Sequence, residues 1–138
     1  MDEMHEVFES VARYFSVLGE PTRLRILHAL CQEEKCVNDI IQVTGLAQAN
    51  VSRHLGLMYQ AGMLSRRREG TQIFYKVADP MYVELCRSVS IQLISRTESG
   101  SATRESLNQF AAGMQAHATG GSPSQSQTPA NRKEEASV

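Results

Sequence analysis

The sequence predicts a mainly α-helical domain that carries a single β-hairpin. Several segments place apolar residues three and four positions apart, as one face of a helix requires, whereas residues 71–77 alternate apolar and polar side chains. Beyond residue 119 the chain is dominated by Gly, Ser, Pro, Gln and Thr, a composition that cannot form a packed core. We therefore expect one domain over residues 1–97 and a mostly disordered tail over residues 98–138, with at most a weak helical segment near its start.

Four helices are expected in the first 60 residues. The first has an apolar face that begins at Val7 and ends at Leu18, and the second opens at Pro21, which is favourable at a helix start. Thr44 and Gly45 end a short third helix, and a tight turn leads into the fourth. The expected bounds are Met4–Leu18, Pro21–Leu30, Val37–Val43 and Gln48–Gln60.

The hairpin and a fifth helix complete the predicted order. Strands are expected over Met63–Arg68 and Thr71–Val77, joined at Glu69 and Gly70. Asp79 and Pro80 then begin a helix that reaches about Arg96, with an apolar stripe. The residues of that stripe are Met81, Tyr82, Leu85, Val89 and Leu93. Helix, helix, short helix, turn, helix, hairpin, helix is the order of a winged helix-turn-helix domain.

The charge distribution favours a polyanionic partner. The whole chain carries a net charge of −1. Residues 46–78, however, contain five basic residues and one acidic residue, a local net charge of +4. A basic patch of this kind is what nucleic acid responds to, although a solvated charged face gives the same pattern.

The fourth helix and the hairpin supply the candidate DNA contacts. Val51, Leu55 and Met58 are expected to face inward, which leaves short polar side chains on the remaining surface. Amide side chains suit adenine edges and Arg53 suits guanine, while guanidinium groups at a hairpin tip reach phosphates or the minor groove. For His54 a packing role is an equal alternative to base contact. The candidates are Gln48, Asn50, Ser52, Arg53, His54, Arg66, Arg67, Arg68 and Thr71.

Other function classes find little support. No run of residues approaches the roughly 18 apolar positions that a membrane span needs, and no secretory leader opens the chain, so we expect a cytoplasmic protein. No nucleophile–base pair, phosphate-binding glycine loop or suggestive carboxylate pair is recognisable, so we expect no enzyme.

At three places the sequence resembles the ArsR/SmtB winged-helix repressors. Leu18–Leu27 resembles the family's entry to the second helix, Gln48–Leu55 its recognition helix, and Arg67–Tyr75 its wing. The resemblance covers roughly residues 8–96. It implies a homodimer built on the first and fifth helices, bound to an imperfect DNA palindrome and released by an inducer or by oxidation.

The metal sites of that family are not reproduced here. The family's arsenic and cadmium sites use two nearby cysteines on the third helix, where this chain has Cys36 followed by Asn38. The zinc site on the family's fifth helix begins Asp-x-His, where this chain has Asp79, Pro80 and Met81. We therefore expect no metal site and no cofactor, with a soft metal or metalloid open only as an inducer.

Three thiols remain as candidates for an inducer site. Cys36 lies at a helix start, where the helix dipole lowers the pKa of a thiol, and Cys31 and Cys86 complete the set. A repressor released by an oxidant, reactive sulfur or a soft metal is one hypothesis. A repressor without an inducer is a second, and a protein-interaction adaptor that uses the same fold is a third.

Overall fold

In the computed structural model, residues 3–115 are described. In chain order the elements are α1 (Glu3–Leu18), α2 (Pro21–Leu30), β1 (Lys35–Cys36), α3 (Val37–Thr44), α4 (Gln48–Gln60), β2 (Leu64–Glu69), β3 (Gln72–Val77), α5 (Pro80–Ser95) and α6 (Ala102–Gly113). The predicted helices and hairpin are therefore present, α6 is the weak helical segment expected near the start of the tail, and β1 is an addition. No helix of the described part is long and apolar enough to cross a membrane.

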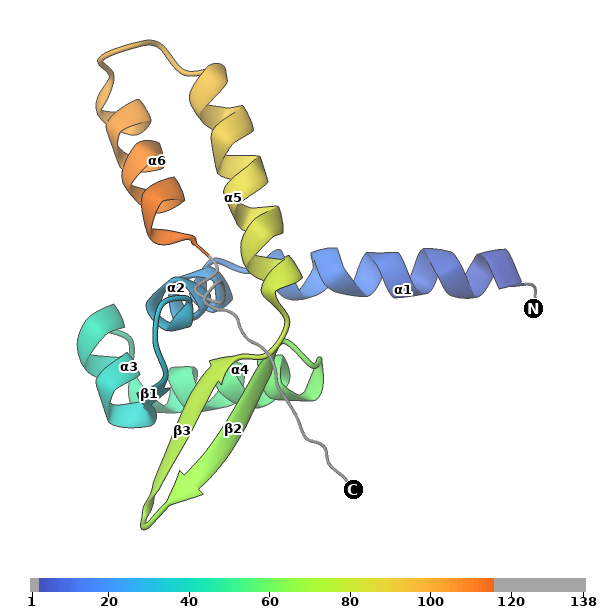
Figure 1. The fold of residues 1–138 in the computed structure, drawn as a ribbon, viewed down its shortest axis with the longest axis vertical. Coiled ribbons are helices and arrows are strands. Elements are labelled where there is room, and N and C mark those ends of the chain that lie inside the picture. Colours follow the sequence, from blue (N-terminus) through green and yellow to red (C-terminus); the bar gives the residue numbers. More distant parts are fainter. Residues whose placement is uncertain (1–2, 116–138) are drawn as a thin grey trace, which may run out of the picture.

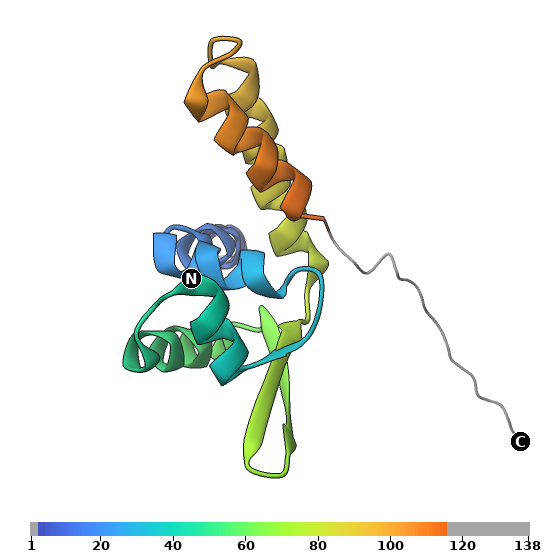
Figure 2. The same cartoon turned by 90° about the vertical axis from the view of Figure 1, so that its left-hand side faces the viewer.

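The fold has two regions (Figures 1 and 2). α2, α3 and α4 form the body, from which the β2–β3 hairpin projects on one side. The α5–α6 pair lies at the opposite end. The strands form an antiparallel sheet in the order β1-β3-β2, in which Cys36 pairs with Phe74 and Arg67 pairs with Phe74 from the other side. We call the β2–β3 hairpin the wing. The winged helix-turn-helix prediction is confirmed.

The core lies between α2, α4 and the start of α5. Its largest side chains with an exposed fraction under 2% are Ile26, Leu27, Leu30, Ile40, Leu55, Met58, Met63, Met114, Val51 and Val83. Burial of large aliphatic side chains is the main stabilising contribution to such a small domain. The buried face of α5 differs from the predicted stripe: Tyr82, Val83 and Cys86 face inward, whereas Met81 and Val89 are half exposed.

α1 makes little use of its apolar face within the chain. It contains no buried residue, and Val7, Phe8, Val11 and Phe15 are all at least half exposed. Figure 1 shows α1 extending away from the body. Its C-terminal half is held to α5, because the rings of Tyr14 and Tyr82 stack at 4.7 Å.

α6 extends the packed structure past residue 97, where the sequence places the domain boundary. It lies against α5, and Met114, just after it, is completely buried in the core. Its end approaches α2 closely: the Gly113 carbonyl accepts a hydrogen bond from the Cys31 thiol at 2.8 Å, and a Cβ on Gly113 would overlap the His28 ring. Residues 116–138, the rest of the expected tail, lie outside the described residues.

Candidate nucleic-acid interface

The turn before α4 sets the direction of that helix. α3 ends at Gly45, whose φ of 73° is a left-handed conformation that favours glycine, and its N–H bonds to the Ile41 carbonyl. α4 then starts three residues later and is anchored by Val51, Leu55 and Met58, each with an exposed fraction of 0%. The inward positions predicted for these three residues are confirmed, and the opposite face of α4 is turned outward.

The outer face of α4 is polar and adjoins the wing. Gln48, Ser52 and Arg53 are exposed, and Asn50 is half-buried. Gln48 and Ser52 also line a hollow of about 230 Å³ with Thr71 and other residues of the wing tip and the start of α3. The structure therefore brings three of the predicted candidates, Gln48, Ser52 and Thr71, together around one hollow between α4 and the wing.

His54 is the exception among the α4 candidates. It is 2% exposed, and its ring nitrogens lie 3.3 Å from Arg23 and 3.2 Å from Arg53. The reason is its spacing, three residues after Val51 and four before Met58, which puts it on the apolar stripe of the helix. Its placement on the outer surface was therefore wrong, and its burial favours the packing role that the sequence left open.

The three wing arginines have different surroundings. The Arg66 guanidinium lies 4.0 Å from the centroid of the Tyr59 ring, a cation–π contact that holds it beside the end of α4. Arg68 is exposed, and its guanidinium forms no hydrogen bond or ion pair within residues 3–115. These two guanidinium groups therefore keep their charge available to an external anion.

Arg67 is neutralised within the chain. It lies on the other face of the wing, over Phe74, and pairs with Glu69 and with Glu34 at 2.9 Å. Hydrogen bonds to Glu34 and Glu69 raise the pKa of Arg67, and the hydrogen bond from Arg67 is the main cause of the lowered pKa of Glu34. Of the three predicted wing contacts, Arg67 is the least available to DNA.

The three cysteines are free thiols and all are buried. Burial raises the pKa of Cys31, and burial raises that of Cys86 to about 11. A thiol is reactive as the thiolate, so both residues are protonated near neutral pH. Cys36 occupies the N-cap position of α3, the helix start at which the sequence placed it, and it makes no side-chain capping hydrogen bond. It also lines the hollow between α4 and the wing. It is the candidate thiol nearest to the polar face of α4.

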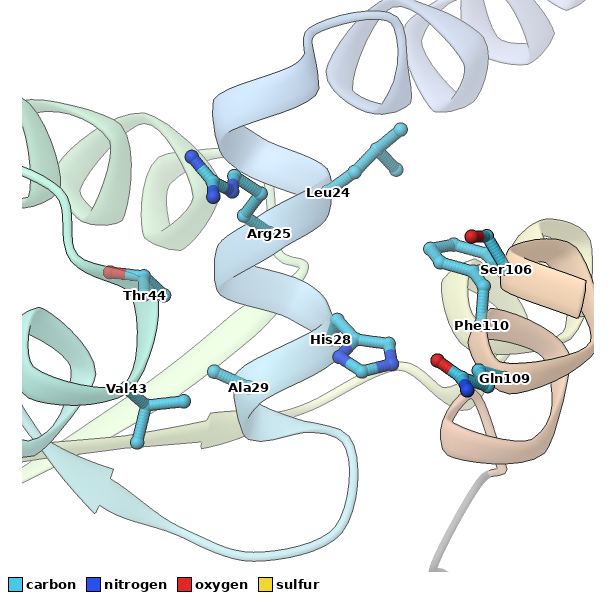
Figure 3. A pocket seen from close by; sticks show the side chains of 9 residues that line it. All are labelled: Leu24, Arg25, His28, Ala29, Val43, Thr44, Ser106, Gln109 and Phe110. Atoms are coloured by element: carbon cyan, nitrogen blue, oxygen red, sulfur yellow. The ribbon is translucent and has the colours of Figure 1, made fainter. Parts of the chain in front are cut away.

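A second groove crosses α2 (Figure 3). It measures about 370 Å³; Val43 and Thr44 lie on one side of α2, and Ser106, Gln109 and Phe110 of α6 lie on the other. No group of three or more His, Cys, Asp or Glu side chains in the described part of the chain has the arrangement of a metal site.

Comparison with known proteins agrees with this architecture. Residues 20–66 match the family of bacterial regulatory proteins described as the arsR family. An HTH-type transcriptional regulator of Methanocaldococcus jannaschii is 36% identical over 85 residues, which cover 61% of this chain and 96% of that protein. A transcriptional repressor SmtB homolog of Synechocystis is 32% identical over 85 residues, which cover 62% of this chain and 64% of the relative.

A solved structure shows the same fold. The homodimeric winged helix-turn-helix DNA-binding domain from Mycobacterium bovis is similar with a TM-score of 0.63 and 29% identity, over 73% of this chain and 94% of that one. The fold and the polar face of α4 define a winged helix-turn-helix transcriptional regulator. The chain belongs to the ArsR family of DNA-binding bacterial regulators, as its motifs predicted.

Proposed function

We propose that this chain is a homodimeric repressor that places α4 in the major groove of an operator and the wing on the adjacent phosphates. The observation that carries the proposal is the hollow that Gln48 and Ser52 share with the wing tip. Arg53 of α4 and Arg68 of the wing are also exposed. Amide, hydroxyl and guanidinium groups read base edges, and unpaired guanidinium groups bind phosphates.

The dimer is proposed to form through α1 and α5. Phe8 is 68% exposed and Phe15 58%, and α5 adds Met81 at 51% and Val89 at 55%. Phe15 and Val89 line one apolar groove between α1 and α5. Exposed apolar surface of this kind on a small protein marks an interaction surface. A second copy is the occupant we propose, because the similar Mycobacterium bovis domain is homodimeric and two copies of α4 would then read the two halves of a palindrome.

A thiol-directed signal is proposed to release the DNA through Cys36. Cys31 and Cys86 are disfavoured as sensors because burial holds the pKa of each thiol above its usual value. An adduct on Cys36 would enlarge the side chain at the hollow that Gln48 and Ser52 share with the wing. It would therefore press on both elements that are proposed to hold DNA.

The test is fluorescence anisotropy of the reduced protein on a duplex that the protein has selected from a random-sequence library. Gln48→Ala together with Ser52→Ala is expected to weaken selective binding about tenfold or more, since each lost base contact costs about 1–3 kcal/mol. N-ethylmaleimide, which adds the thiol across its C=C bond, is expected to release the wild-type protein and not Cys36→Ser. Equal release of both proteins would refute the role of Cys36 and leave a repressor without that inducer site. No selected sequence would favour the adaptor.

A further inference from the structure

His54 is a buried imidazole between two guanidinium groups from different helices. Its Nδ1 lies 3.3 Å from Arg23 Nη1 of α2, and its Nε2 lies 3.2 Å from Arg53 Nη2 of α4. At 2% exposure the ring has almost no access to water. Its hydrogen bonds therefore depend on these two arginines.

Arg23 also contacts the end of the exposed helix α1. Its Nε donates to the Val17 carbonyl at 2.7 Å, and its Nη2 donates to the Ser16 carbonyl at 3.2 Å. The last carbonyls of a helix lack partners within the helix, and a cation there is favourable. One guanidinium thus connects the C-terminal turn of α1 to the ring of His54.

The two arginines compete for His54. A neutral imidazole has one acceptor nitrogen and one N–H, whereas a guanidinium only donates. When Nδ1 accepts from Arg23, Nε2 carries the hydrogen and cannot accept from Arg53. When Nε2 accepts from Arg53, the bond to Arg23 is lost. Only one of the two contacts is a hydrogen bond at any moment.

We infer that His54 is a positioning residue that couples α1 to DNA binding. In the free protein Arg53 donates a hydrogen bond to His54, and when Arg53 turns to DNA, Arg23 donates that hydrogen bond instead. The inference rests on the proposed function, because it needs the exposed Arg53 to leave His54 for a base or phosphate. The hydrogen bond gained by Arg23 then fixes α4 against the end of α1. Since α1 carries the exposed apolar face, dimer geometry and DNA affinity become linked.

Protonation would break this coupling, because an imidazolium has no acceptor nitrogen. Burial lowers the pKa of His54, and the charges of Arg53 and Arg23 lower it further, whereas the Glu20 carboxylate opposes them. Neutral His54 therefore contributes stability that is complete above its usual pKa near 6.5 and is lost as the pH falls through its lower native pKa. The coupling should fail in the same acid range.

Three substitutions at position 54 separate the two contacts. In His54→Asn the amide oxygen takes the place of Nδ1 and accepts a hydrogen bond from Arg23. In His54→Gln the amide oxygen takes the place of Nε2 and accepts from Arg53. His54→Leu offers an acceptor to neither arginine. Each full-length variant is titrated by anisotropy on the duplex selected by the wild-type protein, at pH 7.5 and at a series of lower pH values. Urea unfolding of each variant measures stability separately. His5→Asn, which removes an exposed histidine paired with Glu9, is the matched control.

At pH 7.5 we expect His54→Leu and His54→Gln to bind about tenfold more weakly and His54→Asn to stay within about threefold of wild type. As the pH falls through the lowered native pKa of His54, the wild type and the control should lose affinity, and His54→Asn should not. Arg23→Lys, which keeps the charge but not the three contacts, is expected to match His54→Leu. It replaces that variant if His54→Leu does not fold.

Two results would overturn the inference while leaving the proposed function intact. One is binding by His54→Gln and Arg23→Lys within twofold of wild type, with only their unfolding midpoints lowered, which would show a purely structural role. The other is the same pH dependence in His54→Asn and wild type. A wild-type protein that selects no sequence would overturn the proposed function, and this inference with it.

Discussion

Replacing Arg68 by alanine tests whether the unpaired wing guanidinium contacts DNA phosphate. Arg68 has no partner in the described part of the chain, so its removal breaks no internal ion pair. Each phosphate contact contributes about 0.9 to the slope of log affinity against log salt, so losing one contact per wing lowers the slope of a dimer by about 1.8. Raising salt from about 50 to about 200 mM should then weaken the variant about tenfold less than wild type.

Anisotropy titrations at four salt concentrations measure this slope. Arg96→Ala is the matched control, because it removes the same charge from an exposed residue at the end of α5, away from the wing. We expect its slope to equal that of wild type. The reasoning would be refuted if Arg68→Ala kept the wild-type slope, or if both variants lowered it equally, since the latter would reflect net charge rather than contact.

Three further predictions concern α6, the wing and the thiols. Met114→Ala should lower the free energy of unfolding in urea by about 2–5 kcal/mol, because the side chain is completely buried; a loss below about 0.5 kcal/mol would mean that α6 is not docked. Glu34→Gln should tighten DNA binding about two- to threefold at low salt, because it removes one of the two carboxylates that pair with Arg67; unchanged binding would show that the charge of Glu34 does not oppose DNA binding. In the folded protein at pH 7.5, intact-mass analysis should show maleimide on Cys36 before Cys86. The pKa of Cys86, about 11, leaves about one Cys86 side chain in three thousand as the reactive thiolate. Equal labelling of the two cysteines would contradict this prediction.

The sequence predicted those parts of the fold that depend on local pattern. The helices α1 to α5 and the wing follow from apolar spacing, from Pro21 and Pro80 at helix starts and from Gly45 at a helix end. The same spacing rule places His54 on the buried stripe between Val51 and Met58, so the pattern could have decided for the packing role that the sequence left as an equal alternative.

The remaining features depend on contacts between distant residues. β1 has two residues, too short for any periodicity, and exists only because Cys36 pairs with Phe74. The sequence alone indicates that Arg67 is an unpaired cation, whereas the fold brings Glu34 within 2.9 Å of it. The sequence indicates only a weak helical segment where α6 forms, and the docking of α6 depends on the buried Met114 and on the close approach of its last turn to α2. Tertiary packing of this kind leaves no local sequence signal.

The most direct test of the account compares the affinity of the reduced wild-type protein for its selected duplex with that for a scrambled duplex of equal length and composition. A homodimer reading an operator through α4 predicts an affinity ratio of about a thousand or more, with binding to both duplexes weakened by salt. Equal affinities for the two duplexes, from a protein that is folded and dimeric, would contradict the central claim and leave α4 without a base-reading role.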